Sequence, residues 1–137
     1  MRPCCGGARL PCRPVPGLTV LVVDDDPVIL RLLQVNFEME GHRVITATDG
    51  AEGLARVHDG RPDVVVCDIM MPNVDGLQLL EQLRADAATA GLPVVLLSAK
   101  AQSYEIERGL EAGADDYITK PFDPLELVER VAAVVAR

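Results

Sequence analysis

The stretch from Val64 to Gly76 reads Val-Val-Val-Cys-Asp-Ile-Met-Met-Pro-Asn-Val-Asp-Gly, and the rest of the chain is arranged around it. Its first four residues are apolar and mostly β-branched, which is typical of a strand buried on both faces of a sheet. The run stops at Asp68, and a loop containing proline and glycine then precedes a leucine-rich helical pattern. A carboxylate at the end of such a strand is placed for chemistry rather than for packing. Asp68 is therefore the first candidate for a reactive residue.

The composition limits the class of protein. The chain has 137 residues, enough for one domain with a proper core, and its 49% hydrophobic and 25% charged residues are close to the globular average. A net charge of -8 argues against a nucleic-acid surface, which needs clustered Lys and Arg. No run can span a bilayer, and the prolines interrupt any apolar leader. We expect a cytoplasmic protein that makes no direct contact with nucleic acid or membrane.

Residues 1–17 differ in character from the rest of the chain. They contain three of the four cysteines, four prolines and three arginines, with no acidic residue. The thiolates of Cys4, Cys5 and Cys12 could bind a metal, but no second group of ligands with zinc-like spacing follows them. A disordered tail is therefore the preferred interpretation. Cys67 lies inside an apolar run and is predicted to be part of the core.

From residue 18 onwards, strand and helix patterns alternate. Short apolar runs predict strands over residues 18–23, 43–47, 63–67, 93–97 and 116–118. Helical spacing predicts helices over residues 27–41 and 49–59, around Leu77, Leu80 and Leu83, over 103–112, and from Asp123 to the end. Asp26 before Pro27, and Asp49 three residues before Glu52, are typical N-caps. His42 and His58 fall at helix ends or loops, where we expect them to be solvated.

This alternation predicts an α/β domain over residues 18–137. Parallel strands need helical crossovers, and these place helices on both faces of the sheet. At this length the natural choice is a flavodoxin-like, doubly wound (βα)5 fold with a five-stranded parallel sheet in the order 2-1-3-4-5. Function in such sheets sits at the carboxyl ends of the strands. In this chain those ends carry Asp24, Asp25 and Asp26, then Asp68, then Ser98, then Lys120.

These residue types suit a phosphoryl group. Two carboxylates about 4 Å apart repel by roughly 4 kcal/mol at an effective dielectric near 20, so something positive should offset them. A hard divalent cation such as Mg2+ fits, because the nearby ligands are all oxygen. Lys120 adds a second positive charge, and the Ser98 hydroxyl can bind an oxyanion. For Asp26 alone, the cap to the following helix remains the preferred interpretation.

The motifs resemble those of a response-regulator receiver domain of bacterial two-component signalling. The resemblance covers about residues 18–137. It rests on Val-Leu-Val-Val-Asp-Asp-Asp, Asp-Ile-Met-Met-Pro-Asn-Val-Asp-Gly, Leu-Leu-Ser-Ala and Gly-Ala-Asp-Asp-Tyr-Ile-Thr-Lys-Pro-Phe, in this order. Each motif alone is weak, but together at the strand ends they are specific.

The resemblance implies a role for each site residue. Asp68 would be the phosphoacceptor and would bind Mg2+ together with Asp25. Asp24 would bind the metal through water, and the backbone carbonyl of Met70 would complete the protein ligands. Lys120 and Ser98 would contact the phosphoryl oxygens. The peptide bond between Lys120 and Pro121 would be cis, a form common only before proline.

The resemblance also implies partners and a switch. The donor would be a phosphohistidine on a sensor histidine kinase or phosphotransfer protein, so the domain would catalyse its own phosphorylation and dephosphorylation without being a turnover enzyme. Phosphorylation would draw the Ser98 hydroxyl inward and let Tyr117 turn, remodelling the face formed by the fourth helix, fifth strand and fifth helix. The sequence is compatible both with a stand-alone regulator and with a domain of a longer protein.

A homodimer through that output face is left open. The charged set that winged-helix regulators use for dimerisation is matched by Asp115, Asp116, Glu126, Arg130 and Arg137. However, Ile106 stands where that subfamily has a basic residue in the fourth helix. Met70 and Lys100 flank the site at positions that tune the lifetime of the phosphoryl group in such regulators. Their identity does not predict a rate of dephosphorylation.

Two other functions compete with this interpretation. A phosphatase of the haloacid dehalogenase type also uses a strand-end Asp nucleophile, but it needs a second Asp two residues later, where this chain has Met70. It also needs a cap domain, for which there is no room. A pseudo-receiver that binds partners without phosphorylation is disfavoured by the intact acidic set.

Overall fold

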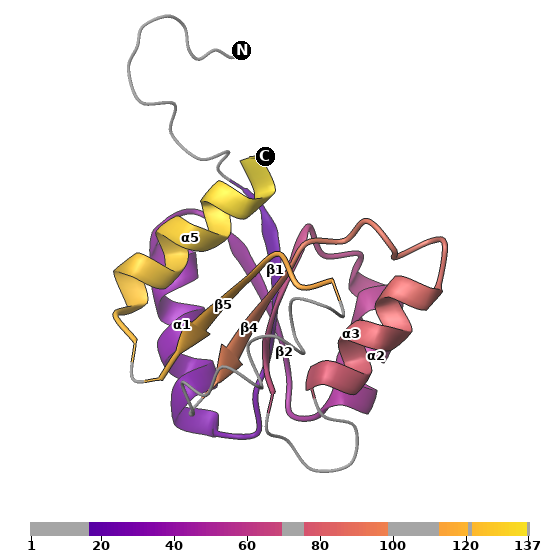
Figure 1. Cartoon of the computed structure of the whole chain (residues 1–137). Helices are drawn as coiled ribbons and strands as arrows, with labels where there is room; N and C mark the ends of the chain where they lie inside the picture. Colours follow the sequence, from indigo (N-terminus) through magenta and orange to yellow (C-terminus); the bar gives the residue numbers. More distant parts are fainter. Residues whose placement is uncertain (1–16, 70–75, 99–112, 121, 137) are drawn as a thin grey trace, which may run out of the picture.

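The computed structural model describes residues 17–69, 76–98, 113–120 and 122–136 and shows a five-stranded parallel sheet (Figure 1). The strand order is β2-β1-β3-β4-β5, which confirms the predicted flavodoxin-like topology. The strands are β1 (Thr19–Val23), β2 (Arg43–Ala47), β3 (Val64–Asp68), β4 (Val94–Ser98) and β5 (Asp116–Thr119). All four neighbouring pairs are parallel.

Helices cover both faces of this sheet, as predicted. They are α1 (Pro27–Met39), α2 (Gly50–Gly60), α3 (Gly76–Ala85) and α5 (Pro124–Ala136). In Figure 1, α1 and α5 lie on one side of the strands and α2 and α3 on the other. Within the described ranges, no helix has the length and apolar character needed to cross a membrane. The helix predicted over 103–112 and residues 1–16 of the tail predicted over 1–17 lie outside the described residues.

The core consists of two apolar clusters separated by the sheet. Alternate residues of β3 point to opposite faces, so Val64 and Val66 join the cluster under α1 and α5, whereas Val65 and Cys67 join the cluster under α2 and α3. Cys67 has no exposed surface, which confirms its predicted core position. Because the central strands are apolar on both faces, only their ends are free to carry polar chemistry.

The predicted helix caps are present. The Asp26 carboxylate accepts the N–H of Val28 at 2.9 Å, directly before Pro27. The Asp49 carboxylate accepts the N–H of Glu52 at 2.8 Å, and the Glu52 carboxylate accepts the N–H of Thr48, one residue before the cap, at 2.7 Å. The caps fix the points at which the chain turns from strand to helix, and therefore the residues that lie at the carboxyl edge of the sheet.

Three strands extend one residue beyond their predicted ends. The ladder pairs Asp68 with Leu97 and Ser98 with Thr119, so Asp68 and Ser98 are the last residues of β3 and β4. The apolar pattern could not show this, because backbone hydrogen bonds continue the ladder independently of side-chain polarity. Both side chains are thus held by sheet backbone rather than by a loop.

His42 is buried, with 8% of its surface exposed, so the prediction of a solvated histidine was wrong. Its Nδ1 accepts the N–H of Leu18 at 3.3 Å and so caps the entry to β1. Burial lowers the pKa of the imidazole, although Glu40 partly opposes this. The neutral ring is the form that can accept this hydrogen bond.

Candidate functional site

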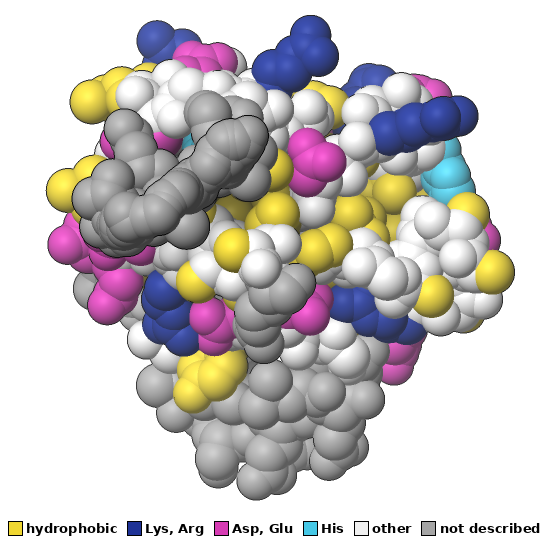
Figure 2. Space-filling view, turned by 90° about the horizontal axis from the view of Figure 1, so that it is seen from above, with side chains coloured by type: hydrophobic (Ala, Val, Ile, Leu, Met, Phe, Trp, Pro, Cys, Tyr) yellow, Lys and Arg dark blue, Asp and Glu magenta, His cyan; other side chains and the backbone are white. Residues whose placement is uncertain are grey.

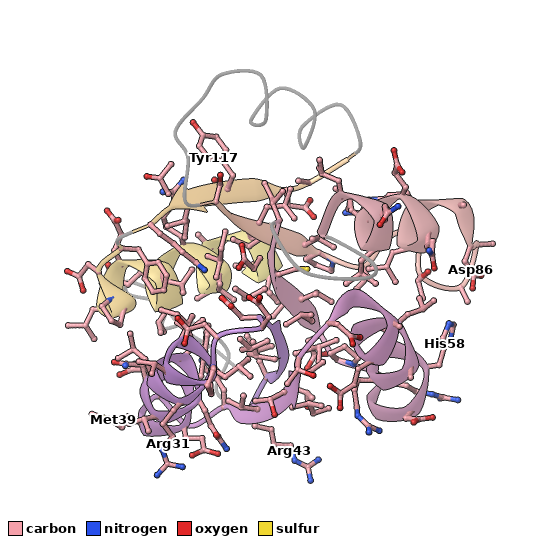
Figure 3. All side chains as sticks on the ribbon, turned by 90° about the horizontal axis from the view of Figure 1, so that it is seen from below. Arg31, Met39, Arg43, His58, Asp86 and Tyr117 are labelled. Atoms are coloured by element: carbon pink, nitrogen blue, oxygen red, sulfur yellow. The ribbon has the colours of Figure 1, made fainter. Side chains whose placement is uncertain are left out.

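The strand register brings the predicted site residues to one edge of the sheet. β1 and β3 pair as far as Val23 and Cys67, so Asp24 and Asp68 directly follow paired positions. β4 and β5 pair as far as Ser98 and Thr119, and Lys120 comes next. The N–H of Lys120 donates to the carbonyl of Ser98 at 2.7 Å, which continues the ladder to the lysine itself. Figure 3 views the molecule from this edge.

The Lys120 ammonium lies between two carboxylates. Its Nζ is 3.0 Å from Oδ2 of Asp24 and 3.1 Å from Oδ2 of Asp68. Asp24 is fully buried and Asp68 is 5% exposed, whereas the lysine side chain is 19% exposed. Lys120 thus offsets part of the charge that the buried carboxylates carry, although it lies 96 residues from Asp24 and 52 from Asp68 along the chain.

The pKa shifts follow from this arrangement. Burial raises the pKa of Asp24, and nearby Asp68 adds to the rise, while hydrogen bonds from the Asp26 N–H and from Lys120 oppose it. Burial alone would lower the pKa of Lys120, but its hydrogen bonds and attraction to Asp24 and Asp68 together outweigh burial and raise it. Lys120 is therefore a firmly charged ammonium at neutral pH.

Asp24, Asp25 and Asp68 form a cluster that could bind a metal. Each can offer one carboxylate oxygen, and these three oxygens lie within 4.8 Å of one another. With the lysine, the group carries three negative charges and one positive charge, so a divalent cation would neutralise it. The donor set is all oxygen, as Mg2+ prefers. The residues therefore fit the metal that the sequence predicts.

The three acids are not equivalent. Asp24 uses one oxygen for the N–H of Asp26 at 2.9 Å and the other for Lys120. Asp25 is exposed, and its carboxylate has no hydrogen-bond or ion-pair partner among the residues that the structure describes. The oxygens of Asp25 are thus available to a cation, whereas both oxygens of Asp24 already accept hydrogen bonds.

Gly76, the first residue of α3, approaches the end of β3 too closely for a side chain. Its N–H donates to the carbonyl of Ile69 at 3.0 Å. A Cβ at this position would lie 2.9 Å from the Cα of Ile69 and would also collide with the carbonyl of Asp68. The glycine therefore allows the helix to pack against the backbone that holds Asp68. The sequence signal was its position after the predicted loop, but the close approach depends on packing between α3 and β3.

Gly76→Ala is expected to lower the free energy of unfolding by about 3 kcal/mol, because the added methyl group displaces the backbone at Asp68 and Ile69. Chemical denaturation with urea measures this change. Gly91→Ala is the matched control, since a Cβ there meets nothing within 4 Å, and it should stay within about 0.5 kcal/mol of wild type. Equal stability of the two variants would contradict the close approach.

The remaining predicted site residues are only partly described. Ser98 is 1% exposed at the end of β4, and Tyr117 is a partly buried residue of β5 whose side chain points outward in Figure 3. Met70 and Pro121 lie outside the described residues, so the carbonyl ligand and the cis peptide bond stay predictions.

Two acids of the predicted dimer set have partners within the chain. Asp116 receives two hydrogen bonds from Arg130, at 2.6 and 3.0 Å. Asp115 pairs with Arg84 at 3.1 Å and accepts the N–H of Val94 at 2.8 Å. Arg84 also donates to the carbonyls of Leu92 and Gly113. Sequence patterns did not reveal this role of Arg84, because its partners lie far away along the chain.

The chain thus has a doubly wound parallel sheet with an acid cluster and a lysine at its carboxyl edge, an arrangement suited to handling a phosphoryl group, and the comparisons place the chain within one family. The model of the response regulator receiver domain matches residues 20–132. The chain belongs to this family, whose members are signalling domains that interact with histidine kinases.

Curated relatives and solved structures agree with this assignment. The chain is 45% identical over 118 residues to the alkaline phosphatase synthesis transcriptional regulatory protein PhoP of Bacillus subtilis, covering 86% of this chain and 48% of the relative. It is 43% identical to the DNA-binding response regulator MtrA of Mycolicibacterium smegmatis, covering 86% and 50%. It therefore spans about half the length of these relatives.

Two solved structures show the same fold. The receiver domain of the Francisella response regulator 1452 matches with a TM-score of 0.82 at 40% identity, covering 88% of this chain and 98% of that one. The chemotaxis response regulator CheY4 of Vibrio cholerae matches with a TM-score of 0.81 at 29% identity, covering 86% and 98%.

Proposed function

We propose that this domain is a phosphorylation-controlled switch in which Asp68 accepts a phosphoryl group from a phosphohistidine of a sensor kinase or phosphotransfer protein in the cytoplasm. The observation that carries the proposal is the Lys120 ammonium held against the buried carboxylates of Asp24 and Asp68 at the carboxyl edge of the sheet. A structural ion pair alone would not need Asp25, a third and exposed acid, beside it.

In the phosphoryl transfer, one bond to phosphorus forms and one breaks. A carboxylate oxygen of Asp68 forms a bond to phosphorus while the bond between phosphorus and the imidazole nitrogen breaks. That nitrogen leaves with the electron pair and takes up a proton. Lys120, already 3.1 Å from Asp68, is placed to contact the phosphoryl oxygens, and Ser98 at the neighbouring strand end supplies a hydroxyl. In dephosphorylation, water attacks phosphorus, the bond between phosphorus and the Asp68 oxygen breaks, and phosphate and the free carboxylate are released.

Asp25 and Asp68 are the residues that we propose hold Mg2+, with Asp24 acting through water and the carbonyl of Met70 as a further ligand. When bound, the ion supplies positive charge that offsets the carboxylates and the phosphoryl oxygens. The support for this assignment within the described residues is the unpaired Asp25 carboxylate and the net charge of the cluster.

The switch that we propose is a population shift. A phosphoryl group on Asp68 is a stronger hydrogen-bond acceptor than the carboxylate, so it draws the Ser98 hydroxyl toward it. Tyr117 on β5 would then turn inward, altering the face formed by the predicted fourth helix, β5 and α5. The support for this is its place on β5, the strand that pairs with the one carrying Ser98, where its ring is partly buried against the cluster under α2 and α3. The relatives are named as transcriptional regulators, and we propose that this region supplies the switch rather than the DNA contact.

Incubation with acetyl phosphate and Mg2+ tests the function. The intact mass of the wild-type chain is expected to increase by one phosphoryl group, and chelation of the metal with EDTA before the incubation should prevent the increase. The adduct should disappear on standing, because acyl phosphates hydrolyse. A chain that never gains mass, or gains it equally in EDTA, would contradict the proposal.

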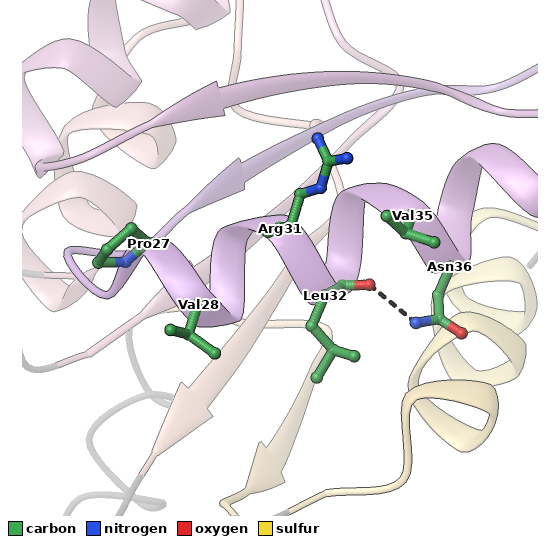
Figure 4. A pocket seen from close by; sticks show the side chains of 6 residues that line it. All are labelled: Pro27, Val28, Arg31, Leu32, Val35 and Asn36. Atoms are coloured by element: carbon green, nitrogen blue, oxygen red, sulfur yellow. Dashed lines mark hydrogen bonds between the residues drawn. The ribbon is translucent and has the colours of Figure 1, made fainter.

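The exposed apolar face of α1 is the surface where we propose that the phosphoryl donor docks. Val28, Leu32, Val35 and Met39 recur at helical spacing and are 70%, 38%, 38% and 74% exposed. The first three line a groove of about 550 Å³ with Pro27, Arg31 and Asn36 (Figure 4). The stripe begins three residues after Asp25, so a donor whose apolar helix covers it would present its phosphohistidine beside the acid cluster.

Leu32→Gln is expected to slow phosphotransfer from a kinase about tenfold while leaving the reaction with acetyl phosphate unchanged, because only a protein donor needs the apolar surface. The rate should be measured with the sensor kinase that phosphorylates the wild-type chain fastest in a panel. Ala55→Gln, at an exposed position of α2 on the other side of the sheet, is the matched control and should transfer normally. Equal slowing with both donors would instead indicate damage to the site.

A further inference from the structure

A second cavity lies at the edge of the sheet where the strands begin, far from the acid cluster. It has a volume of about 400 Å³, within the range of small-molecule sites, and lies between the end of α2 and the loop before β4. Val57 and Leu92 supply apolar surface, and His58, Arg61 and Thr89 supply polar atoms. Figure 2 views this side of the molecule and shows basic side chains and a histidine beside an apolar surface.

The basic groups of this cavity have no partners in the part of the chain that the structure describes. Neither His58 nor Arg61 has a side-chain hydrogen bond or ion pair among the described residues. Arg56 on the same helix, in contrast, pairs with Glu52 and Asp59. A guanidinium at the rim of a partly apolar cavity is suited to a carboxylate, which it can bind through two parallel hydrogen bonds.

The backbone at Arg61 is the second observation. Its φ of 46° is the only positive value at a non-glycine position in the described ranges. Its N–H closes α2 by donating to the carbonyl of Val57 at 3.1 Å. Glycine would take this left-handed conformation without strain, so an arginine here is unfavourable for the helix end alone. Strained positions of this kind are concentrated at binding sites.

From these observations we propose that the cavity binds a small organic anion, with its carboxylate on Arg61 and His58 and its apolar body against Val57 and Leu92. The Thr89 hydroxyl is already engaged by the carbonyl of Leu83 at 2.7 Å and therefore shapes the wall of the cavity. The site is separate from Asp68 and requires no phosphorylation.

The negative charge of Asp86 is expected to repel such a ligand. Removal of this charge should therefore tighten binding, whereas removal of the Arg61 guanidinium should weaken it. Its carboxylate accepts the N–H of Ala88, a residue that lines the cavity, at 2.9 Å. Figure 3 labels His58 and Asp86 at the same edge of the molecule. Asn in place of Asp86 keeps an oxygen for the Ala88 N–H but removes the negative charge that repels an anion.

Titration of 2-naphthoate into the isotopically labelled 137-residue chain, followed by amide NMR, tests the proposal. We expect saturable shifts centred on Arg61, Thr89 and Leu92. Arg61→Gly keeps the helix end and removes the guanidinium, so it should weaken binding at least about tenfold. Asp86→Asn should tighten binding by about twofold. Arg56→Gln, which alters an already paired arginine on the same helix, and Asp68→Asn should bind like wild type.

Three results would overturn the proposal. The first is the absence of saturable shifts in the wild-type chain. The second is binding of one of two control ligands as tight as that of 2-naphthoate. Equal binding of neutral 2-naphthylmethanol would show that the negative charge is not recognised, and equal binding of inorganic phosphate would show that the apolar wall does not contribute. The third is unchanged affinity in Arg61→Gly, since the arginine would then serve only as a residue at the helix end.

Discussion

Asp68→Asn is expected to abolish the phosphoryl adduct formed with acetyl phosphate and Mg2+. The amide has nearly the shape of the carboxylate, and its oxygen can still accept the hydrogen bond from Lys120. However, it has no anionic oxygen to attack phosphorus. The side chain is 5% exposed at the last position of β3, so its neighbours hold it in place regardless of its charge. Intact-mass measurement should therefore show an unmodified chain.

The same variant should be at least as stable as wild type. Removing one of three clustered carboxylates relieves repulsion with Asp24 and Asp25, which should raise the free energy of unfolding by about 1 kcal/mol at neutral pH. If the variant is folded and stabilised but forms no adduct, the adduct is lost because the reactive group is missing and not because the chain is unfolded. An adduct of normal yield on Asp68→Asn would place the phosphoacceptor elsewhere.

Lys120→Gln is expected to lower the free energy of unfolding by about 3 kcal/mol at neutral pH in EDTA. Its ammonium is the cation that the described residues place against Asp24 and Asp68, and the loss leaves two buried carboxylates without it. Because the pKa of Lys120 is raised in the fold, its stabilisation is present below the ordinary lysine pKa of about 10.4 and is lost as pH rises through the folded value.

A double-mutant cycle attributes this loss to a specific pair. Burial raises the pKa of Asp24, so the charged side chain is unfavourable at neutral pH, and Asp24→Asn should itself stabilise the fold. In the Asp24→Asn background, Lys120→Gln should cost about 1 to 2 kcal/mol less than in wild type. Urea denaturation of the four proteins gives the coupling. Additive effects would show that Lys120 does not stabilise the fold through Asp24.

The position of the site could be predicted from the sequence because it follows from one rule of parallel sheets. Parallel strands end at a common edge, so Asp24, Asp68, Ser98 and Lys120 had to approach one another once the strands were recognised. The central strands β1, β3 and β4 were recognisable because both faces of the sheet are covered and nearly every residue within them is apolar. The helix caps at Asp26 and Asp49 were predictable for a similar reason, since a cap depends on only a few neighbouring residues.

Features that depend on distant neighbours were not predictable. Three consecutive aspartates gave no indication that Asp24 would be buried and Asp25 exposed, because this depends on Lys120 and on the turn after β1. His42 looked like a solvated helix-end residue, but it accepts a backbone N–H 24 residues away. The intramolecular pairs of Asp115 and Asp116 likewise involve arginines on α3 and α5, which no local pattern connects to them.

The central claim is that the phosphoryl group is carried by Asp68, and reductive trapping tests it most directly. The chain is phosphorylated with acetyl phosphate and Mg2+ and denatured, and borohydride then reduces the aspartyl phosphate to homoserine, which peptide mass spectrometry locates. The account predicts homoserine at position 68 alone and none in a sample incubated without donor. Homoserine at position 24 or 25, or a phosphorylated chain with unmodified Asp68 after reduction, would contradict it.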